Sequence, residues 1–199
     1  EDIFALHAAA YPGFDHKAAG DMMRARDLPL GKRYRLLSRG ERRWLLNAAV
    51  LATGADLLLL DEPADGLDTA ARRRLFDRLR DFVTDRHATA LVATHIIGDI
   101  ERVADEVAVI DRGRLQMHED LEELRETVRH VQAPTRVKLR RSELDVLAEE
   151  IKGEVRLLWA RSDDWERTKL PPEARTRHVS LEELYLAVTG RSGEKREKE

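Results

Sequence analysis

The sequence has no cysteine among its 199 residues. This absence excludes disulfide scaffolds, thiolate metal sites and cysteine nucleophiles. The sequence also lacks any apolar run close to the ~20 residues that a membrane-spanning helix needs. No signal peptide is recognisable at the N-terminal end. We therefore expect a cytoplasmic protein.

An excess of basic charge is also missing. Lys and Arg number 35 against 38 Asp and Glu, so the formal net charge is −3. No basic field exists to hold a nucleic acid, and we expect no nucleic-acid partner. Hydrophobic residues make up 42% of the chain. That share is enough for a folded core in one large domain or two small ones.

Two sequence signatures of catalysis are absent. The phosphate loop G-x-x-x-x-G-K-[ST] does not occur, since Gly31-Lys32 is followed by Arg33 and residue 26 is Arg. The zinc motif H-E-x-x-H does not occur either. The chain starts at Glu1, within a helical pattern, rather than at Met. We therefore expect it to be part of a longer protein, in which a missing motif can lie upstream.

What the sequence does contain is an alternation of helical and strand patterns. Apolar spacing predicts helices over residues 1–10, 15–26, 39–53 and 69–84, and strands over residues 88–93, 106–110 and 114–118. The run Leu57–Leu60 is too short for a helix and indicates a strand covered on both faces. This alternation is typical of an α/β fold with a doubly wound parallel sheet.

The last third of the chain has a different pattern. It predicts helices over residues 119–130 and 142–151, strands over residues 136–139 and 154–159, and a final helix after Ser180. Ser142 with Asp145, and Ser180 with Glu183, resemble capping boxes. We expect four regions: a helical subdomain (1–54), an α/β part (55–131), a small α+β extension (135–189) and a charged, disordered tail (190–199).

Two carboxylates follow the leucine strand, in the segment Asp61-Glu62-Pro63. Open α/β sheets bind ligands at the carboxyl ends of their strands. One carboxylate there can hold a hard cation such as Mg²⁺, and the other can orient or deprotonate a water. His95 follows the strand over 88–93, where it can lie beside them. The alternatives are a pair of helix-capping acids and a histidine without a function.

Two further segments combine small and polar residues at helix starts. Ser38 and Gly40 begin the helix over 39–53, and a helix N-terminus is a suitable anion site. Asp68 ends the turn over residues 65–68, before another helix. The alternatives are an N-cap serine in the first segment and ordinary turn and N-cap residues in the second.

The order and spacing of these segments resemble those of the ATP-binding cassette (ABC) ATPases. Leu37-Ser38-Arg39-Gly40-Glu41 resembles the signature motif of this family, and Leu57–Pro63 resembles its Walker B strand. Gly66-Leu67-Asp68 resembles the D-loop, and Thr94-His95 resembles the segment of the switch histidine. The similarity covers about residues 1–130, and Ser180–Glu183 is similar to the end of bacterial export-type subunits. The signature departs from the family pattern at Arg39 and Glu41, where Gly and Gln are usual. The family's Walker A phosphate loop and its glutamine loop would precede residue 1.

The resemblance implies a partial P-loop NTPase (RecA-like) parallel sheet, with part of the ABC helical subdomain and the small α+β extension. It also implies ATP and Mg²⁺ as cofactors, and a role for each motif residue. Ser38 and Gly40 would bind the γ-phosphate of a partner's ATP, Asp61 would hold Mg²⁺, Glu62 would polarise the attacking water, His95 would contact the γ-phosphate, and Asp68 would reach across the dimer.

The function that the resemblance implies is an ATP-binding and ATP-hydrolysing subunit of an ABC transporter. Such a subunit lies on the inner face of the cell membrane, pairs with a second ATP-binding subunit and binds a transmembrane permease. We expect this chain alone to bind Mg-ATP poorly and to be inactive, because it has no phosphate loop. The alternative is an ABC-type ATPase outside transport, or a non-catalytic assembly module.

Overall fold

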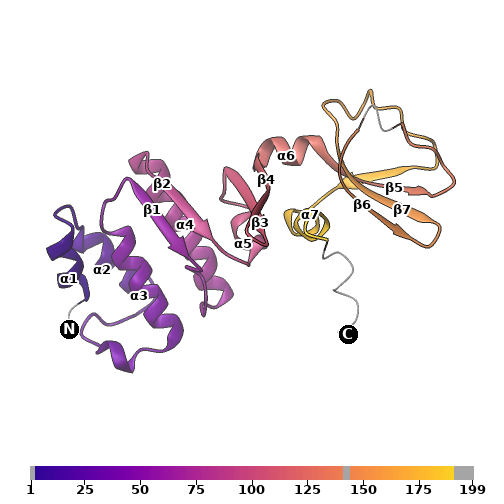
Figure 1. Cartoon of the computed structure of the whole chain (residues 1–199). Coiled ribbons are helices and arrows are strands. Elements are labelled where there is room, and N and C mark those ends of the chain that lie inside the picture. Colours follow the sequence, from indigo (N-terminus) through magenta and orange to yellow (C-terminus); the bar gives the residue numbers. More distant parts are fainter. Residues whose placement is uncertain (1–2, 141–143, 191–199) are drawn as a thin grey trace. The chain divides into compact units, whose positions relative to one another are not determined.

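The computed structural model describes residues 3–140 and 144–190. The predicted capping residue Ser142 and residues 191–199 of the predicted tail lie outside these ranges. The chain divides into two compact units, one that ends at Val103 and one that begins at Ala104 (Figure 1). No helix among the described residues is long and apolar enough to cross a membrane.

The first unit begins with the three helices that the apolar spacing predicts. They are α1 (Ile3–Ala10), α2 (His16–Arg24) and α3 (Arg39–Leu51). Asp15 caps α2 by accepting a hydrogen bond from the Ala18 N–H at 2.9 Å. A short 3-10 turn, η1 (Tyr34–Leu36), precedes α3 and was not predicted. Gly54, with φ of +70°, follows the end of α3 in the left-handed conformation that favours glycine.

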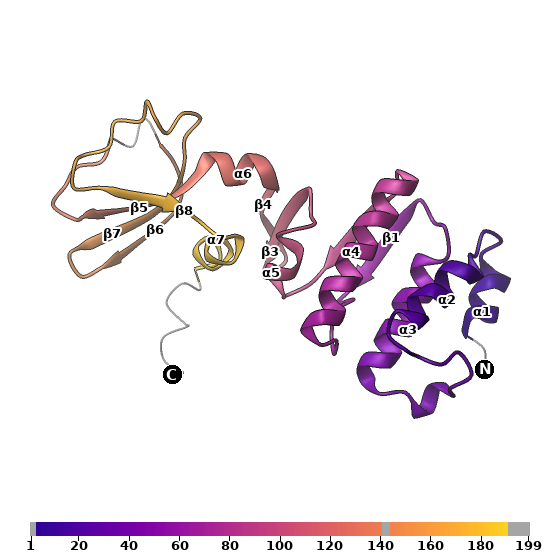
Figure 2. The ribbon, with the colours of Figure 1, turned by 180° about the vertical axis from the view of Figure 1, so that it is seen from behind.

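The second half of this unit is a parallel β-α-β arrangement, as predicted. Strand β1 (Leu57–Asp61) pairs in parallel with β2 (Thr89–Ala93), and α4 (Thr69–Arg86) connects them (Figure 1). Figure 2 shows α4 in front of β1. A short helix, α5 (Ile97–Ile100), follows β2. The core of the unit joins α3, α4 and β1 through buried apolar side chains, among them Trp44, Leu58, Leu75, Phe76 and Leu79. The mixed α/β class with a parallel sheet is therefore confirmed.

The prediction that the leucine strand is covered on both faces is wrong for the described residues. Leu58 is 3% exposed, whereas Leu59 is 70% exposed and Leu57 is also open to solvent. On β2, Leu91 is exposed as well. Successive strand side chains point to opposite faces. One face of the β1–β2 pair therefore packs on the helices, and the other presents leucines to solvent.

The second unit begins with an antiparallel hairpin and a helix. The elements are β3 (Glu106–Asp111), β4 (Arg114–Asp120) and α6 (Leu121–Thr127). Both strands were predicted, and the hairpin turns at Gly113, whose φ is +73°. A four-stranded antiparallel sheet follows, and the chain then forms α7 (Leu181–Val188). The order of its strands is β6 (Asp145–Lys152), β7 (Val155–Arg161), β5 (Val128–Pro134) and β8 (Arg175–His178). The predicted capping box of this last helix, between Ser180 and Glu183, is confirmed.

Several predictions for the second unit are wrong. The helix expected over 119–130 ends at Thr127, and strand β5 (Val128–Pro134) starts directly after it. The expected strand over 136–139 is instead turn and coil. Strand β8 (Arg175–His178) was not predicted, since its four exposed polar residues carry no apolar alternation.

The largest error concerns residues 142–151, which were expected to form a helix. They include most of strand β6 (Asp145–Lys152), which pairs with β7 (Val155–Arg161) through a turn at Gly153. The segment carries helix-favouring Leu, Ala and Glu residues. Hydrogen bonding to β7 outweighs that local preference, because tertiary context routinely overrides a helix propensity of a few tenths of a kcal/mol per residue.

Candidate active site

The two strand ends of the first unit bring Glu62 and His95 together. Glu62 follows β1, and its N–H donates to the Ala93 carbonyl at 2.8 Å, which extends the parallel ladder by one residue. Its carboxylate accepts hydrogen bonds from the Thr94 hydroxyl at 3.2 Å and from the His95 N–H at 3.1 Å. The His95 Nδ1 atom lies 2.7 Å from Glu62 Oε1. The prediction that these two side chains lie side by side is confirmed in geometry.

The charge state of Glu62 follows from these contacts. The hydrogen bond from His95 lowers the pKa of Glu62 below its usual value, and partial burial acts in the opposite direction without cancelling it. Glu62 is therefore ionised at neutral pH. An ionised carboxylate is a hydrogen-bond acceptor only, which suits a group that would orient a water.

Asp61 is the last residue of β1, and it is exposed at the same strand end. Residues 3–140 and 144–190 contain no group of three or more side chains that could hold a metal by themselves. Mg²⁺ is commonly held by one or two carboxylates together with substrate phosphates. A single exposed carboxylate fits that arrangement, so Asp61 is a suitable ligand for an ion that arrives with a nucleotide.

Ser38 caps α3 through a complete capping box. The Ser38 hydroxyl accepts from the Glu41 N–H at 3.2 Å, and Glu41 Oε2 accepts from the Ser38 N–H at 2.6 Å. The backbone hydrogen bond from Ser38 and the contact with Lys32 Nζ at 2.9 Å lower the pKa of Glu41 to about 2. The N-cap alternative for Ser38 is thus confirmed. A role toward a phosphate stays a prediction.

Asp68 is also held within its own chain. One carboxylate oxygen accepts from the Ala71 N–H at 2.8 Å and caps α4, while the other pairs with the Arg26 guanidinium at 2.7 Å. The hydrogen bond from Ala71 and the charge of Arg26 keep the pKa of Asp68 below its usual value. The capping alternative is confirmed here too, and a contact across a dimer stays a prediction.

The start of α3 lies against the turn that precedes Asp68. A Cβ atom on Gly40 would meet the Gly66 carbonyl oxygen at 2.7 Å, so the two backbones touch. Arg39 and Arg43, both on α3, form ion pairs with the Asp65 carboxylate. Sequence analysis missed these links, because no short motif predicts contacts between residues so far apart in the chain.

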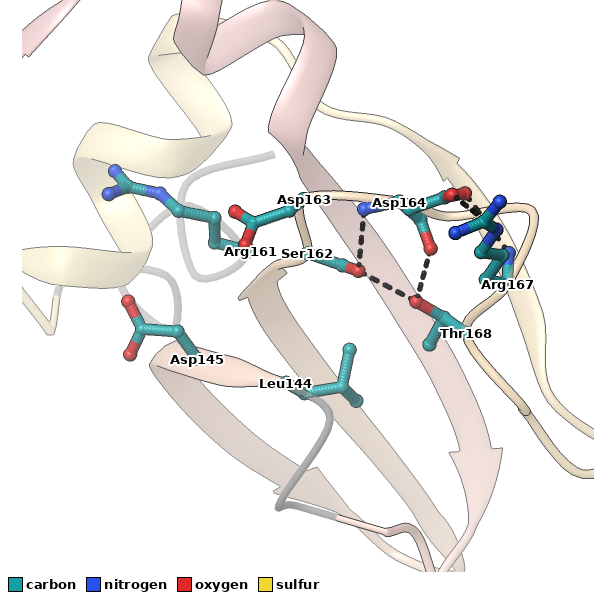
Figure 3. Close-up of a pocket in the computed structure, with 8 residues that line it drawn as sticks. All are labelled: Leu144, Asp145, Arg161, Ser162, Asp163, Asp164, Arg167 and Thr168. Atoms are coloured by element: carbon teal, nitrogen blue, oxygen red, sulfur yellow. Dashed lines mark hydrogen bonds and ion pairs between the residues drawn. The ribbon is translucent and has the colours of Figure 1, made fainter.

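A hollow of about 580 Å³ lies elsewhere, in the second unit (Figure 3). It is lined by Leu144, Asp145, Arg161, Ser162, Asp163, Asp164, Arg167 and Thr168. Ser162 and Thr168 hydrogen-bond at 2.7 Å, and Arg167 pairs with Asp164 at 3.2 Å. None of the six predicted site residues lines this hollow, so the candidate active site is an open strand edge and not this cavity.

A protein-family model described as "AAA domain, putative AbiEii toxin, Type IV TA system" matches residues 31–98, the stretch that holds all six predicted site residues. The chain is also 34% identical over 116 residues to the ABC transporter ATP-binding protein YtrB of Bacillus subtilis, covering 58% of this chain and 40% of that protein.

A second relative matches a larger share of the chain. The Nod factor export ATP-binding protein I of Burkholderia lata is 34% identical over 166 residues, covering 78% of this chain and 54% of that protein. The chain thus spans about half the length of the curated relatives that it matches. Among solved structures, an ATP-binding subunit of an ABC transporter gives a TM-score of 0.52 at 24% identity, covering 62% of this chain and 53% of that one.

A cobalt transport ATP-binding protein gives a TM-score of 0.54 at 19% identity, covering 81% of this chain and 58% of that structure. At such identities the structures establish the fold alone, and that fold is the ABC ATPase P-loop NTPase domain, matched over part of its length. The predicted resemblance to ABC ATPases is therefore confirmed. The curated relatives that carry it are ABC transporter ATP-binding proteins.

Proposed function

We propose that the chain is part of the ATP-binding and ATP-hydrolysing subunit of an ABC transporter, and that it couples hydrolysis to transport. The observation that carries this proposal is the Glu62 carboxylate, held between Thr94 and His95 at the ends of two parallel strands. The proposal is also supported by relatives whose names describe ATP-binding proteins of ABC transporters.

Asp61 and Glu62, at the end of β1, would take part in ATP hydrolysis. Bound Mg-ATP supplies the phosphoryl group and a cation that neutralises its charge. Asp61 would hold the ion from one side. Glu62, already ionised, would accept a hydrogen bond from the attacking water and orient it.

His95 would contact the γ-phosphate through the ring atom that Glu62 leaves available. Its Nδ1 faces the Glu62 carboxylate at 2.7 Å, and the side chain is 75% exposed. An ionised carboxylate only accepts, so Nδ1 carries the proton in this contact. Nε2 is then the atom that faces a phosphate. It can donate to a phosphate oxygen once the Glu62 contact opens and the ring proton lies on Nε2.

The start of α3 would serve the nucleotide of a second ATP-binding subunit. Ser38 and Gly40 open a helix of 13 residues, and its N-terminal dipole favours an anion. The negative charge of Glu41 opposes that preference, and Lys32 offsets it at 2.9 Å. Asp68 would reach toward the same partner from the end of the turn that contacts Gly40.

Each region of the chain would have a role of its own. Residues 1–54 would form the helical, signature-bearing subdomain, in which residues 1–36 would face the transmembrane permease. Residues 55–131 would form the hydrolytic α/β part. Residues 135–189 would be a small C-terminal α+β extension, whose sheet also contains β5 (Val128–Pro134), followed by a tail over 190–199. The assembled subunit would lie on the cytoplasmic face of the membrane.

The test is the substitution Glu62→Gln in the subunit purified with its permease. Loss of a positioned general base typically lowers turnover by about 10²–10⁴-fold. Glu126→Gln, on the exposed side of α6, is the matched control and keeps wild-type turnover. Undiminished turnover in Glu62→Gln would remove Glu62 from this role, and failure to co-purify with any permease would favour an ABC-type ATPase outside transport.

A second test uses the 199-residue chain alone. Without a phosphate loop in its sequence, it should bind Mg-ATP weakly and hydrolyse none. Titration calorimetry measures the affinity. Micromolar binding to this chain would contradict the proposal that the phosphate cradle is supplied by another segment.

A further inference from the structure

Asn47 is a buried polar residue in a helix whose other inward side chains are mostly apolar. It lies on α3, nine residues after the cap Ser38, and is 6% exposed. Its Nδ2 atom donates to the Pro63 carbonyl oxygen at 2.8 Å. Pro63 directly follows Glu62. One buried hydrogen bond therefore connects the helix that starts at the signature segment with the residue beside the candidate base.

Glu62 needs support from its surroundings. Its φ is +45°, in the left-handed region that residues with a Cβ atom rarely adopt. Such a conformation persists only when neighbouring structure holds it, and it occurs often at functional sites. The Glu62 N–H is held by Ala93, and the Glu62 carbonyl accepts from the Asp65 N–H at 3.1 Å. These contacts close a turn over residues 62–65.

Helix α3 holds this turn at two points of unequal strength. At one, Arg39 and Arg43 pair with the Asp65 carboxylate. The Arg39 side chain is 76% exposed and the Arg43 contact is 3.8 Å long, and ion pairs of this kind contribute little. At the other, the Asn47 amide and the Pro63 carbonyl meet in the protein interior. A buried carbonyl that loses its donor is costly, because no water replaces it. Asn47 is therefore the stronger of the two links.

We propose that Asn47 is a positioning residue for Glu62. It ties the turn over residues 62–65 to α3, so that a displacement of the α3 start at Ser38 moves the Glu62 carboxylate relative to Thr94 and His95. The proposal rests on the proposed function, in which Ser38 contacts a partner's nucleotide and Glu62 orients the water. Asn47 itself would contact neither the nucleotide nor the water, and it acts on Glu62 through the turn.

The first experiment removes the donor and measures the turn. Asn47→Leu keeps a side chain of similar size without the amide. Native-state hydrogen exchange, read by NMR on the 199-residue chain, should show at least about tenfold faster exchange of the Asp65 N–H. That factor corresponds to ~1.4 kcal/mol of lost local stability. Amides inside the β1–β2 ladder should exchange at the wild-type rate.

The matched control is Trp44→Phe. Trp44 also lies on α3 and also donates to a backbone carbonyl from a buried position, but its partner is Met22 on α2, at 2.8 Å. This variant should leave exchange at Asp65 unchanged, whatever it does to global stability. Unchanged exchange at Asp65 in folded Asn47→Leu, or an equal rise in both variants, would overturn the proposal.

A measurement on the wild-type chain tests the proposal even if Asn47→Leu does not fold. If Asn47 holds the turn, one opening event exposes both the Asn47 side-chain amide and the Asp65 N–H. Their exchange rates should then rise together as denaturant is added. Independent rates would overturn the proposal.

Steady-state kinetics test the positioning role of Asn47 separately from the hydrolytic role of Glu62, on which it rests. In the subunit with its permease, Asn47→Leu should lower kcat by about 10-fold or more and leave the KM for ATP unchanged, since a small misplacement of a catalytic group is costly. If Glu62→Gln keeps full turnover while the exchange results hold, the hydrolytic role of Glu62 fails and the positioning link stands. If Glu62→Gln is inactive and Asn47→Leu keeps wild-type kcat, the positioning role fails.

Discussion

A Cβ atom on Gly40 would lie 2.7 Å from the Gly66 carbonyl oxygen, closer than folded proteins allow. The start of α3 and the turn before α4 therefore meet backbone to backbone. The family resemblance explains a glycine at position 40 by its approach to a phosphate. The structure adds a steric reason within the chain itself, which applies whether or not a nucleotide is bound.

The first prediction concerns this contact. Gly40→Ala should destabilise the N-terminal unit by about 1–3 kcal/mol, as overpacking of a tight contact does. Urea denaturation followed by Trp44 fluorescence, with Trp159 and Trp165 replaced by Phe, measures the loss. Gly31→Ala is the matched control, because a Cβ there meets nothing within 4 Å. Equal effects of the two substitutions would contradict the steric explanation.

The second prediction tests the one-sided burial of the leucine strand. Leu58 is 3% exposed and Leu59 is 70% exposed. Leu58→Ala should cost about 2–5 kcal/mol of unfolding free energy, as in other buried cores. Leu59→Ala should stay within about 0.5 kcal/mol of wild type. Chemical denaturation of the chain measures both, and equal losses would show that both faces are covered in solution.

The third prediction concerns Glu41, whose pKa is lowered to about 2. A carboxyl group with a depressed pKa stabilises the folded state above its ordinary value of 4.5, and that stability is lost as the pH falls toward 2. Glu41→Gln can keep the capping box but does not titrate. The melting temperatures of wild type and variant should therefore converge between pH 5 and about 2.5. A constant difference over this range would contradict the expected linkage.

The fourth prediction concerns His130 on β5, which is buried against the Trp159 ring at a centroid distance of 5.0 Å. Burial lowers the pKa of His130, the charges of Arg177 and Lys152 add to that effect, and Glu183 opposes it. The unfolded chain therefore binds the proton more readily. The stability of the second unit should fall as the pH decreases below about 6.5.

His130→Phe keeps the aromatic contact and should remove this dependence between pH 7.5 and about 5.5. Near-UV circular dichroism during thermal unfolding is the measurement, with Trp44 and Trp165 replaced by Phe so that the tryptophan signal comes from Trp159. Leu115→Ala, at an exposed position on β4, changes no titratable group and is the control, which should keep the wild-type pH dependence. If the stability of His130→Phe keeps the wild-type pH dependence, that dependence belongs to another titratable group.

Much of the site could be predicted because its elements are local. The apolar run at Leu57–Leu60 and the helical spacing around it predicted β1, α3 and α4, and the parallel pairing of β1 with β2 was expected from their alternation. Strand ends in a parallel sheet meet at one edge. The proximity of Glu62 and His95 followed from that rule.

Other parts could not be read from local pattern. Residues 145–152 favour a helix by composition, and their strand conformation depends on pairing with β7. Strand β8 has no apolar alternation, and its assignment depends on pairing with β5. In both segments the hydrogen-bonding partner is remote in the chain, so no local window contains the deciding interaction.

The sequence by itself determined the class of protein, the order of the motifs and the helix caps at Asp15, Ser38 and Ser180. Each of those caps is a hydrogen bond between residues three apart, and such bonds depend on local chain geometry alone. Only the tertiary structure decided the link from Asn47 to Pro63 and the backbone contact of Gly40 with Gly66. Those contacts join residues 16 and 26 positions apart, and they exist because the packing of α3 against β1 and α4 brings distant backbone groups together.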